Sequence, residues 1–302
     1  MSGGAVAEGE WQPAGRLDAA RSGLAAAVLE GTLYAAGGAG LTDPRDEFES
    51  YDAELDRWFS ETPLPRGLER FGMSVIEDRI YIAGGYARGE LGGVGPSPAM
   101  WSWSPQSRIW QSEAPMPAPR ADFSLIAADG RLFAIGGAFD DEAIFVFDPE
   151  AREWDSLDAP EGIVRPGAAA LALEGEIFVA GGFDSDAPSR HVHLYTVADD
   201  SWTEAPMLPE GRAGAAIAQD AQGRIHLFGG RGPGSVTLDS HISWMPGEAS
   251  WRVEEDLPSP RTNAAAAQLE DGIFVVGGGS GGGFLAPFTA LDTTDVYRET
   301  GD

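Results

Sequence analysis

An apolar run that ends in a pair of glycines, IFVAGG at residues 177–182, recurs along this chain of 302 residues. Five further copies share the pattern: LYAAGG at 33–38, IYIAGG at 80–85, LFAIGG at 132–137, IHLFGG at 225–230 and IFVVGG at 273–278. The first glycines of successive copies lie 47, 52, 45, 48 and 48 residues apart. A nearly constant period of this length is typical of a repeat architecture in which each unit packs on its neighbours.

Tryptophan follows the same period, and we call the residues concerned the frame tryptophans: Trp11, Trp58, Trp110, Trp154, Trp202 and Trp251. Each of the last five comes seven residues after another aromatic residue: Tyr51, Trp103, Phe147, Tyr195 and Trp244. Tyr297 is the sixth aromatic residue of this kind, and no tryptophan follows it. An arginine opens each unit: Arg21, Arg70, Arg120, Arg165, Arg212 and Arg261.

Each unit is expected to contain four short strands, a to d, because its apolar runs are short and separated by Gly, Pro and Asp. Strand a follows the arginine, strand b ends in Gly-Gly, strand c carries the aromatic residue and strand d carries the frame tryptophan. The first segment has a strand d alone, and the last unit lacks one. The N-terminal strand is therefore expected to complete the last unit and close a ring, which removes exposed sheet edges.

These motifs, in this order, resemble the kelch repeat over residues 9–298. The resemblance implies a single all-β domain, a six-bladed kelch-type β-propeller over residues 1–302. We expect the blades at approximately 16–62, 63–113, 114–156, 157–205, 206–255 and 256–298, the last completed by a strand at 9–13. In such a ring the glycines and frame tryptophans are expected to be structural.

Composition narrows the possible functions. The chain has 48 Asp and Glu against 20 basic residues, all of them Arg, and its net charge is −28. This charge disfavours nucleic acid and anionic membranes as partners. The absence of Cys excludes thiolate metal sites and the Cys–Tyr cross-link of the copper-radical oxidases in the kelch family. Two explanations of the acidic composition remain open: adaptation to high salt, or a coding bias. With no leader-like N-terminus, we expect a cytoplasmic monomer.

Loop lengths predict which face of the propeller binds. From the second glycine to the aromatic residue of strand c, the distance ranges from 10 to 19 residues, whereas the step from that residue to the frame tryptophan is always 7. The variable b–c connections lie on the same face as the d–a connections and the arginines. Because scaffolds concentrate variation where binding occurs, we expect the ligand on this face.

Departures from the repeat template mark candidate binding residues there. Two residues after the arginine, four units have Gly, whereas the third and sixth have Asp122 and Asn263. These two residues are expected to face each other across the ring. After Gly-Gly, three units have a large residue: Tyr86, Phe183 and Arg231. Trp101 lies outside the frame, in the blade with the second-longest b–c loop. A difference in local turn or packing is the alternative explanation for each of these residues.

The six unit arginines are candidates for a ring of guanidinium groups at the channel mouth, since Arg binds carboxylates in a bidentate manner. The same arginines could instead bond turn carbonyls. We predict a binding module for an anionic or carboxylate-bearing small molecule or an acidic protein segment. The resemblance also implies an alternative, a metal-independent isomerase similar to kelch sialic-acid mutarotases, with Asp122 as the catalytic acid–base group. An accessory biosynthetic enzyme is a further alternative.

We expect no cofactor and no metal. His191 and His193 would share one face of a strand, but no third ligand is evident near them. No phosphate-binding loop or dinucleotide fingerprint occurs in the sequence.

Overall fold

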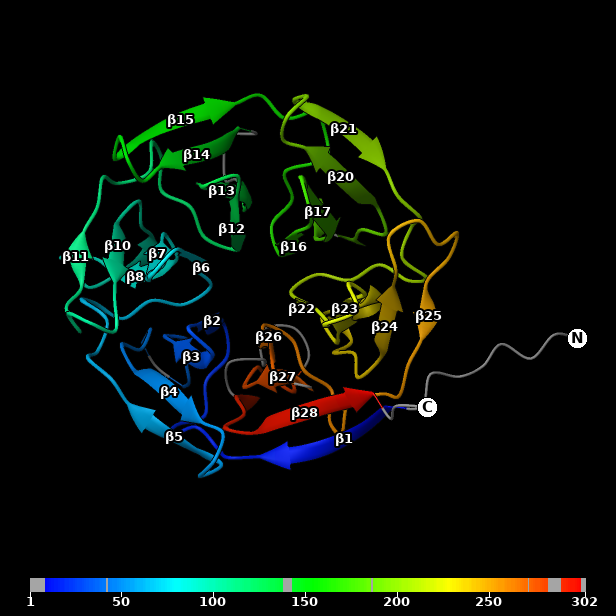
Figure 1. Cartoon of the computed structure of the whole chain (residues 1–302), viewed down its shortest axis with the longest axis horizontal. Coiled ribbons are helices and arrows are strands. Elements are labelled where there is room, and N and C mark those ends of the chain that lie inside the picture. Colours follow the sequence, from blue (N-terminus) through cyan, green and yellow to red (C-terminus); the bar gives the residue numbers. More distant parts are fainter. Residues whose placement is uncertain are drawn as a thin grey trace, which may run out of the picture.

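The computed structural model describes residues 9–41, 43–137, 143–185, 187–270, 272–281 and 289–299. In these ranges the strands form six four-stranded antiparallel sheets, which are arranged as blades around a central axis (Figure 1). The predicted all-β, six-bladed propeller is therefore confirmed.

The first strand of each blade lies at the axis and the last lies at the rim (Figure 1). Blade 1 contains β2 (Ala25–Leu29), β3 (Thr32–Ala36), β4 (Phe48–Asp52) and β5 (Arg57–Ser60), and blade 2 contains β6 (Gly72–Ile76), β7 (Arg79–Ala83), β10 (Met100–Trp103) and β11 (Gln111–Ser112). Blade 3 contains β12 (Phe123–Ala128), β13 (Arg131–Gly136), β14 (Ile144–Asp148) and β15 (Glu153–Leu157), and blade 4 contains β16 (Ala168–Ala172), β17 (Glu176–Gly181), β20 (Val192–Thr196) and β21 (Ser201–Glu204). Blade 5 contains β22 (Ala216–Gln219), β23 (Ile225–Phe228), β24 (His241–Trp244) and β25 (Arg252–Val253), and blade 6 contains β26 (Ala265–Leu269), β27 (Gly272–Val276), β28 (Thr294–Glu299) and β1 (Gly9–Ala14).

The b–c connections carry additional structure. Small hairpins occupy those of blades 2 and 4, formed by β8 (Tyr86–Arg88) with β9 (Val94–Pro96) and by β18 (Phe183–Asp184) with β19 (Ala187–Pro188). A short 3₁₀ turn, η1 (Pro233–Ser235), lies in that of blade 5. No helix among the described residues has the length and apolar character needed to cross a membrane.

The N-terminal strand closes the ring as expected. β1 pairs antiparallel with β28, with Trp11 opposite Tyr297, and their side-chain rings lie 5.3 Å apart (Figure 1). The Trp11 indole also donates to the carbonyl of Glu255 in the connection leaving blade 5, at 3.0 Å. The first strand of the chain is therefore tied both to the last sheet and to the blade before it.

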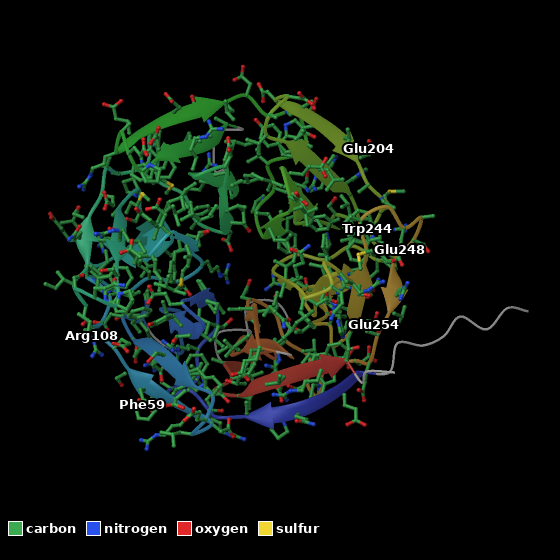
Figure 2. The ribbon with its side chains drawn as sticks, in the orientation of Figure 1. Phe59, Arg108, Glu204, Trp244, Glu248 and Glu254 are labelled. Carbon is green, nitrogen blue, oxygen red and sulfur yellow. The ribbon has the colours of Figure 1, made fainter. Side chains whose placement is uncertain are left out.

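The core lies between the blades. Side chains of neighbouring sheets fill these spaces (Figure 2), and Trp244 of β24 stacks on Phe178 of β17 in the preceding blade, with ring centroids 6.0 Å apart. Four further frame tryptophans donate their indole N–H to a carbonyl near the end of the preceding blade, at 2.8–3.0 Å: Trp58, Trp110, Trp154 and Trp251. These contacts support the expected structural role of the frame tryptophans.

Deleting residues 1–14 should expose the edge of β28 and remove the Trp11 contacts. We expect aggregation, or a loss of about 3 kcal/mol or more in the free energy of unfolding. Deleting residues 1–8, which leaves β1 intact, is the matched control. Denaturant titration with size-exclusion chromatography gives the answer, and a longer deletion variant as stable and monomeric as the control would contradict this account of closure.

Candidate functional site

Six residues encircle one mouth of the central channel, and we call them the mouth ring: Gly23, Arg70, Asp122, Gly167, Gly214 and Asn263. One comes from each blade, one or two residues before its first strand. The amide of each ring residue donates to the carbonyl of the ring residue in the preceding blade, at 2.7–3.0 Å. The six bonds form a closed circle that holds the innermost strands together.

Every mouth-ring residue has a left-handed backbone, with φ between 51° and 71°. Glycine adopts this conformation freely, whereas an L side chain costs roughly 1–2 kcal/mol there. A Cβ added at Gly214 would lie 2.4 Å from Oδ1 of Asn263, so any larger residue there would force the Asn263 side chain to move. Asp and Asn adopt this conformation more readily than other residues with side chains, so Arg70 is the mouth-ring residue that stands against local preference.

Arg70 does not occupy the position that the repeat pattern assigned to it. In blade 2 the position equivalent to the other unit arginines holds Leu68, whose carbonyl accepts from the amide of Gly38 at 2.8 Å. In the other five blades the equivalent bond goes to the unit arginine itself, at 2.8–3.3 Å. Arg70 instead takes the mouth-ring position, which the sequence had assigned to Gly72, and Gly72 is the first residue of β6.

The other five unit arginines do not form the expected guanidinium ring at the mouth, and that geometric expectation is wrong for them. Arg21, Arg120, Arg165, Arg212 and Arg261 are at most 4% exposed. Four of them donate to the carbonyl of the first glycine of their own Gly-Gly pair, as Arg212 does to Gly229 at 3.2 Å. Arg120 bonds the carbonyls of Ala134 and Ala143, at 3.0 and 2.8 Å. Two also form buried ion pairs, Arg21 with Glu49 and Arg261 with Asp295.

A small pocket of about 70 Å³ opens at the mouth ring, and we call it the mouth pocket. Its charged and polar lining consists of Arg70, Asp122, Arg231, Thr262 and Asn263. Phe183, Pro166 and small residues complete it. Asp122 and Asn263 belong to opposite blades, as predicted, and so do Arg70 and Arg231. The pocket thus combines two guanidinium groups with one carboxylate and one amide.

Asp122 holds Arg70 in place. One oxygen of its carboxylate accepts from Nη1 of Arg70 at 3.2 Å, and the other accepts from the Tyr86 hydroxyl at 3.1 Å. Burial and the charge of Asp122 raise the pKa of Tyr86 to about 12, so Tyr86 keeps its proton at neutral pH. Tyr86 does not line the mouth pocket itself, and it contributes by orienting Asp122.

Arg231 reaches the mouth pocket from the residue after the Gly-Gly pair of blade 5. Its guanidinium carbon lies 5.8 Å from the centre of the Phe183 ring, a cation–π arrangement. Burial and the like charge of Arg70 lower the pKa of Arg231. The guanidinium groups of Arg70 and Arg231 therefore repel each other within one pocket. An anion bound between them would reduce this repulsion.

Below the mouth ring the channel is lined largely by residues with small or apolar side chains. It encloses about 220 Å³ and is lined by the first strands of all six blades, with many small residues such as Ala169 and Ala265. A polar group is therefore best accommodated at the mouth, and an apolar group could extend below it.

Trp101 is a further candidate that the structure places away from the mouth pocket. It lies in β10 opposite Ile82 of β7 and Ser112 of β11, and it packs against the buried cluster that includes Trp103. It does not line the mouth pocket. The expectation that Trp101 belongs to the mouth is therefore wrong, and its place is in the packing of blades 1 and 2.

Comparisons with known proteins agree with this architecture. The chain matches the family described as Kelch motif over residues 165–209. It is 28% identical to Kelch-like protein 35 of Mus musculus over 238 residues, 78% of this chain and 40% of that protein. It is 26% identical to Kelch-like protein terF of Aspergillus terreus over 225 residues, 68% of this chain and 48% of that protein. The matching region thus spans less than half the length of these relatives.

Among solved structures, the one titled "Structure of YjhT" superposes with a TM-score of 0.80 at 15% identity, covering 92% of this chain and 95% of that one. A likeness at this identity concerns the fold. The fold and the repeats define a kelch-type propeller with a polar mouth. The motif match and the curated relatives both support the assignment of these repeats as kelch repeats.

Because Arg70 and Arg120 occupy different positions, mutation of each should affect the free energy of unfolding differently. Arg70→Gly relieves the left-handed strain, so we expect stability within about 1 kcal/mol of wild type despite loss of the Asp122 ion pair. Arg120→Ala leaves two carbonyls without their donor and should lower the free energy of unfolding by at least about 2 kcal/mol. Denaturant unfolding of both variants tests this, and equal destabilisation would contradict the division between ring and scaffold arginines.

Proposed function

We propose that this kelch propeller is a binding module that holds a carboxylate group between Arg70 and Arg231 in the mouth pocket. The observation that carries the proposal is the position of Arg70 in the mouth ring. An arginine with φ of 51° stands there in a conformation that glycine adopts at three of the six positions. Its side chain lines the pocket together with Arg231 from the opposite blade.

The size of the pocket supports a small anionic group. The mouth pocket encloses about 70 Å³, compared with about 220 Å³ for the channel. One carboxylate fits there, and a larger ligand would extend beyond it. The rest of the ligand would lie over the mouth, among the b–c connections, or extend into the apolar channel below.

The charge of the whole chain favours a ligand with few negative charges. A net charge of −28 repels polyanions at long range, and only close contacts in the pocket can offset this. A charge-assisted bond from each guanidinium group supplies such contacts. A sugar acid and an acidic peptide segment both carry a carboxylate that could bind in this way. Both are therefore tested as ligands.

Calorimetric titration with a sugar acid and with a short acidic peptide distinguishes the two sources. Arg70→Gln and Arg231→Gln should each weaken binding by about 1.5–3 kcal/mol, or roughly 10- to 150-fold. Arg88→Gln is the matched control. Arg88 lies in β8 on the same face and pairs with Asp43, but it does not line the mouth pocket.

Loss of affinity in Arg88→Gln equal to that in the two pocket variants would show that the face attracts anions without a defined site. Unchanged affinity in both pocket variants would place binding elsewhere. If neither carboxylate source binds to the wild-type protein in the millimolar range, the proposed ligand class is wrong.

The isomerase alternative depends on Asp122 as a proton-transfer group. Its two oxygens accept from Arg70 and Tyr86, which favours a positioning role over transfer of a substrate proton. Asp122→Asn separates the two functions. In a binding module it should change affinity for a carboxylate by less than about tenfold, whereas in an acid–base enzyme it should lower turnover by about 10²–10⁴ with binding largely retained.

A further inference from the structure

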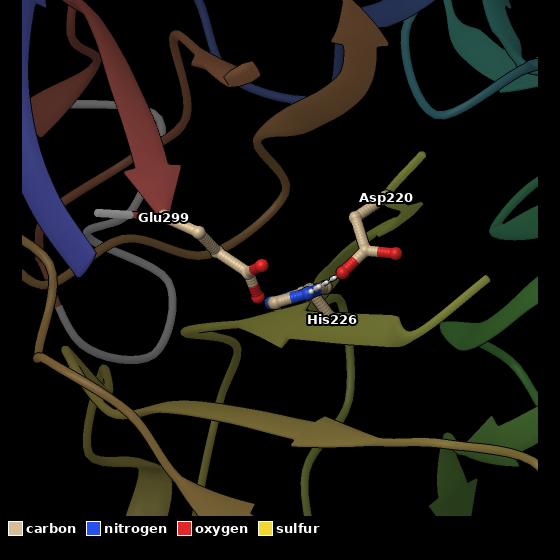
Figure 3. A group of neighbouring side chains, drawn as sticks. All are labelled: Asp220, His226 and Glu299. Carbon is tan, nitrogen blue, oxygen red and sulfur yellow. Dashed lines mark hydrogen bonds and ion pairs between the residues drawn. The ribbon is translucent and has the colours of Figure 1, made fainter. Parts of the chain in front are cut away.

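A second polar cluster lies on the opposite face, between blades 5 and 6. Asp220 is in the turn between β22 and β23, His226 is in β23, and Glu299 ends β28 (Figure 3). One ligand-type atom of each lies within 4.8 Å of the other two. His226 is completely buried, Asp220 is partly buried and Glu299 is exposed. The mouth pocket uses none of these residues.

The hydrogen bonds of His226 determine which of its ring nitrogens is available. The Glu255 carbonyl can only accept, so Nδ1 of His241, 3.2 Å away, carries a proton. In its neutral form the His241 ring carries that proton on Nδ1 alone. Its Nε2 must then accept the bond from Nδ1 of His226, at 2.8 Å.

This arrangement directs Nε2 of His226 toward the Asp220 carboxylate, 3.1 Å away. In a neutral ring that nitrogen is an acceptor, so two acceptors face each other unless a cation lies between them. Either a second proton on His226 or a metal ion satisfies both groups. A second carboxylate, that of Glu299, lies beside the same pair and offers a third ligand atom to a metal ion.

We propose that Asp220, His226 and Glu299 bind a divalent transition metal such as Zn²⁺. One imidazole and two carboxylates are a donor set that such ions take in proteins, and the bond from Nδ1 of His226 to His241 holds the ring in place, as outer contacts of metal-binding histidines do. A cavity of about 280 Å³ adjoins the three residues. Its lining also includes Gln222, Gln268, Glu270 and Tyr297, which leaves room for water on the metal.

The three residues of the cluster come from two neighbouring blades, so a metal ion bound there would link the blades. Asp220 and His226 belong to blade 5, whereas Glu299 belongs to β28 and pairs with Gly9 of the closing strand β1. A bound ion would join blade 5 to the blade at which the ring closes. Binding to the folded state alone raises stability, so the metal should stabilise the propeller at its closure.

The test uses the full chain after treatment with a chelator, with Zn²⁺ alone as the ligand and Co²⁺ as a spectroscopic probe. We expect one equivalent to bind. The melting temperature should rise by roughly 4 °C at about 100 times the dissociation constant. Glu299→Gln alters the exposed ligand and leaves the buried network intact, and it should weaken Zn²⁺ binding at least about tenfold.

Glu174→Gln is the matched control, because it removes the same charge from an exposed turn on the same face of blade 4. It should leave Zn²⁺ affinity unchanged. Equal affinity in wild type and Glu299→Gln would overturn the site. So would the absence of saturable Zn²⁺ binding together with a doubly protonated His226 in histidine ¹⁵N NMR spectra, because a buried ion pair with Asp220 would then account for the cluster.

Discussion

The closed circle of six backbone hydrogen bonds at the mouth ring is the constraint on which the rest of the structure depends. It can close only if every ring residue has a left-handed backbone, and this explains why three positions are glycine. Where a side chain is present instead, the ring fixes its Cα near the axis. The side chains of Arg70, Asp122 and Asn263 are thereby brought to one small pocket, although they are 52 and 141 residues apart in sequence.

A second circle of bonds supports the first. The amide of each second glycine donates to a carbonyl in the next blade, at 2.8–3.3 Å, and both glycines of all six pairs have φ between 56° and 99°. This explains the repeated Gly-Gly motif. The buried arginines stabilise the same turns, because their guanidinium groups donate hydrogen bonds to carbonyls of the turns and to carbonyls near the start of strand c. The chain thus uses five of its arginines as scaffold and leaves Arg70 and Arg231 at the mouth.

The sequence predicted the fold, the closing strand and the opposition of Asp122 and Asn263, because these follow from periodicity alone. It did not predict that Arg70 differs from the other unit arginines, although a signal was present. Arg70 lies 12 residues after its frame tryptophan and 14 before its first glycine, whereas Arg21 lies 10 after and 16 before. A shift by two residues, to Leu68, restores both distances. Burial of the other five arginines and the packing of Trp101 depend on side-chain direction, which repeat spacing does not reveal. The cluster at His226 was missed because its members come from different blades and share no short motif.

A double-mutant cycle of Arg70→Gln and Arg231→Gln, measured by calorimetry with a carboxylate ligand, tests the central claim most directly. If both guanidinium groups hold the same carboxylate, loss of one alters what the other contributes. The two effects should then differ from additivity by about 0.5 kcal/mol or more. Full additivity of two substantial losses would show that the arginines act on separate groups, and it would contradict the account of one anion held between opposite blades.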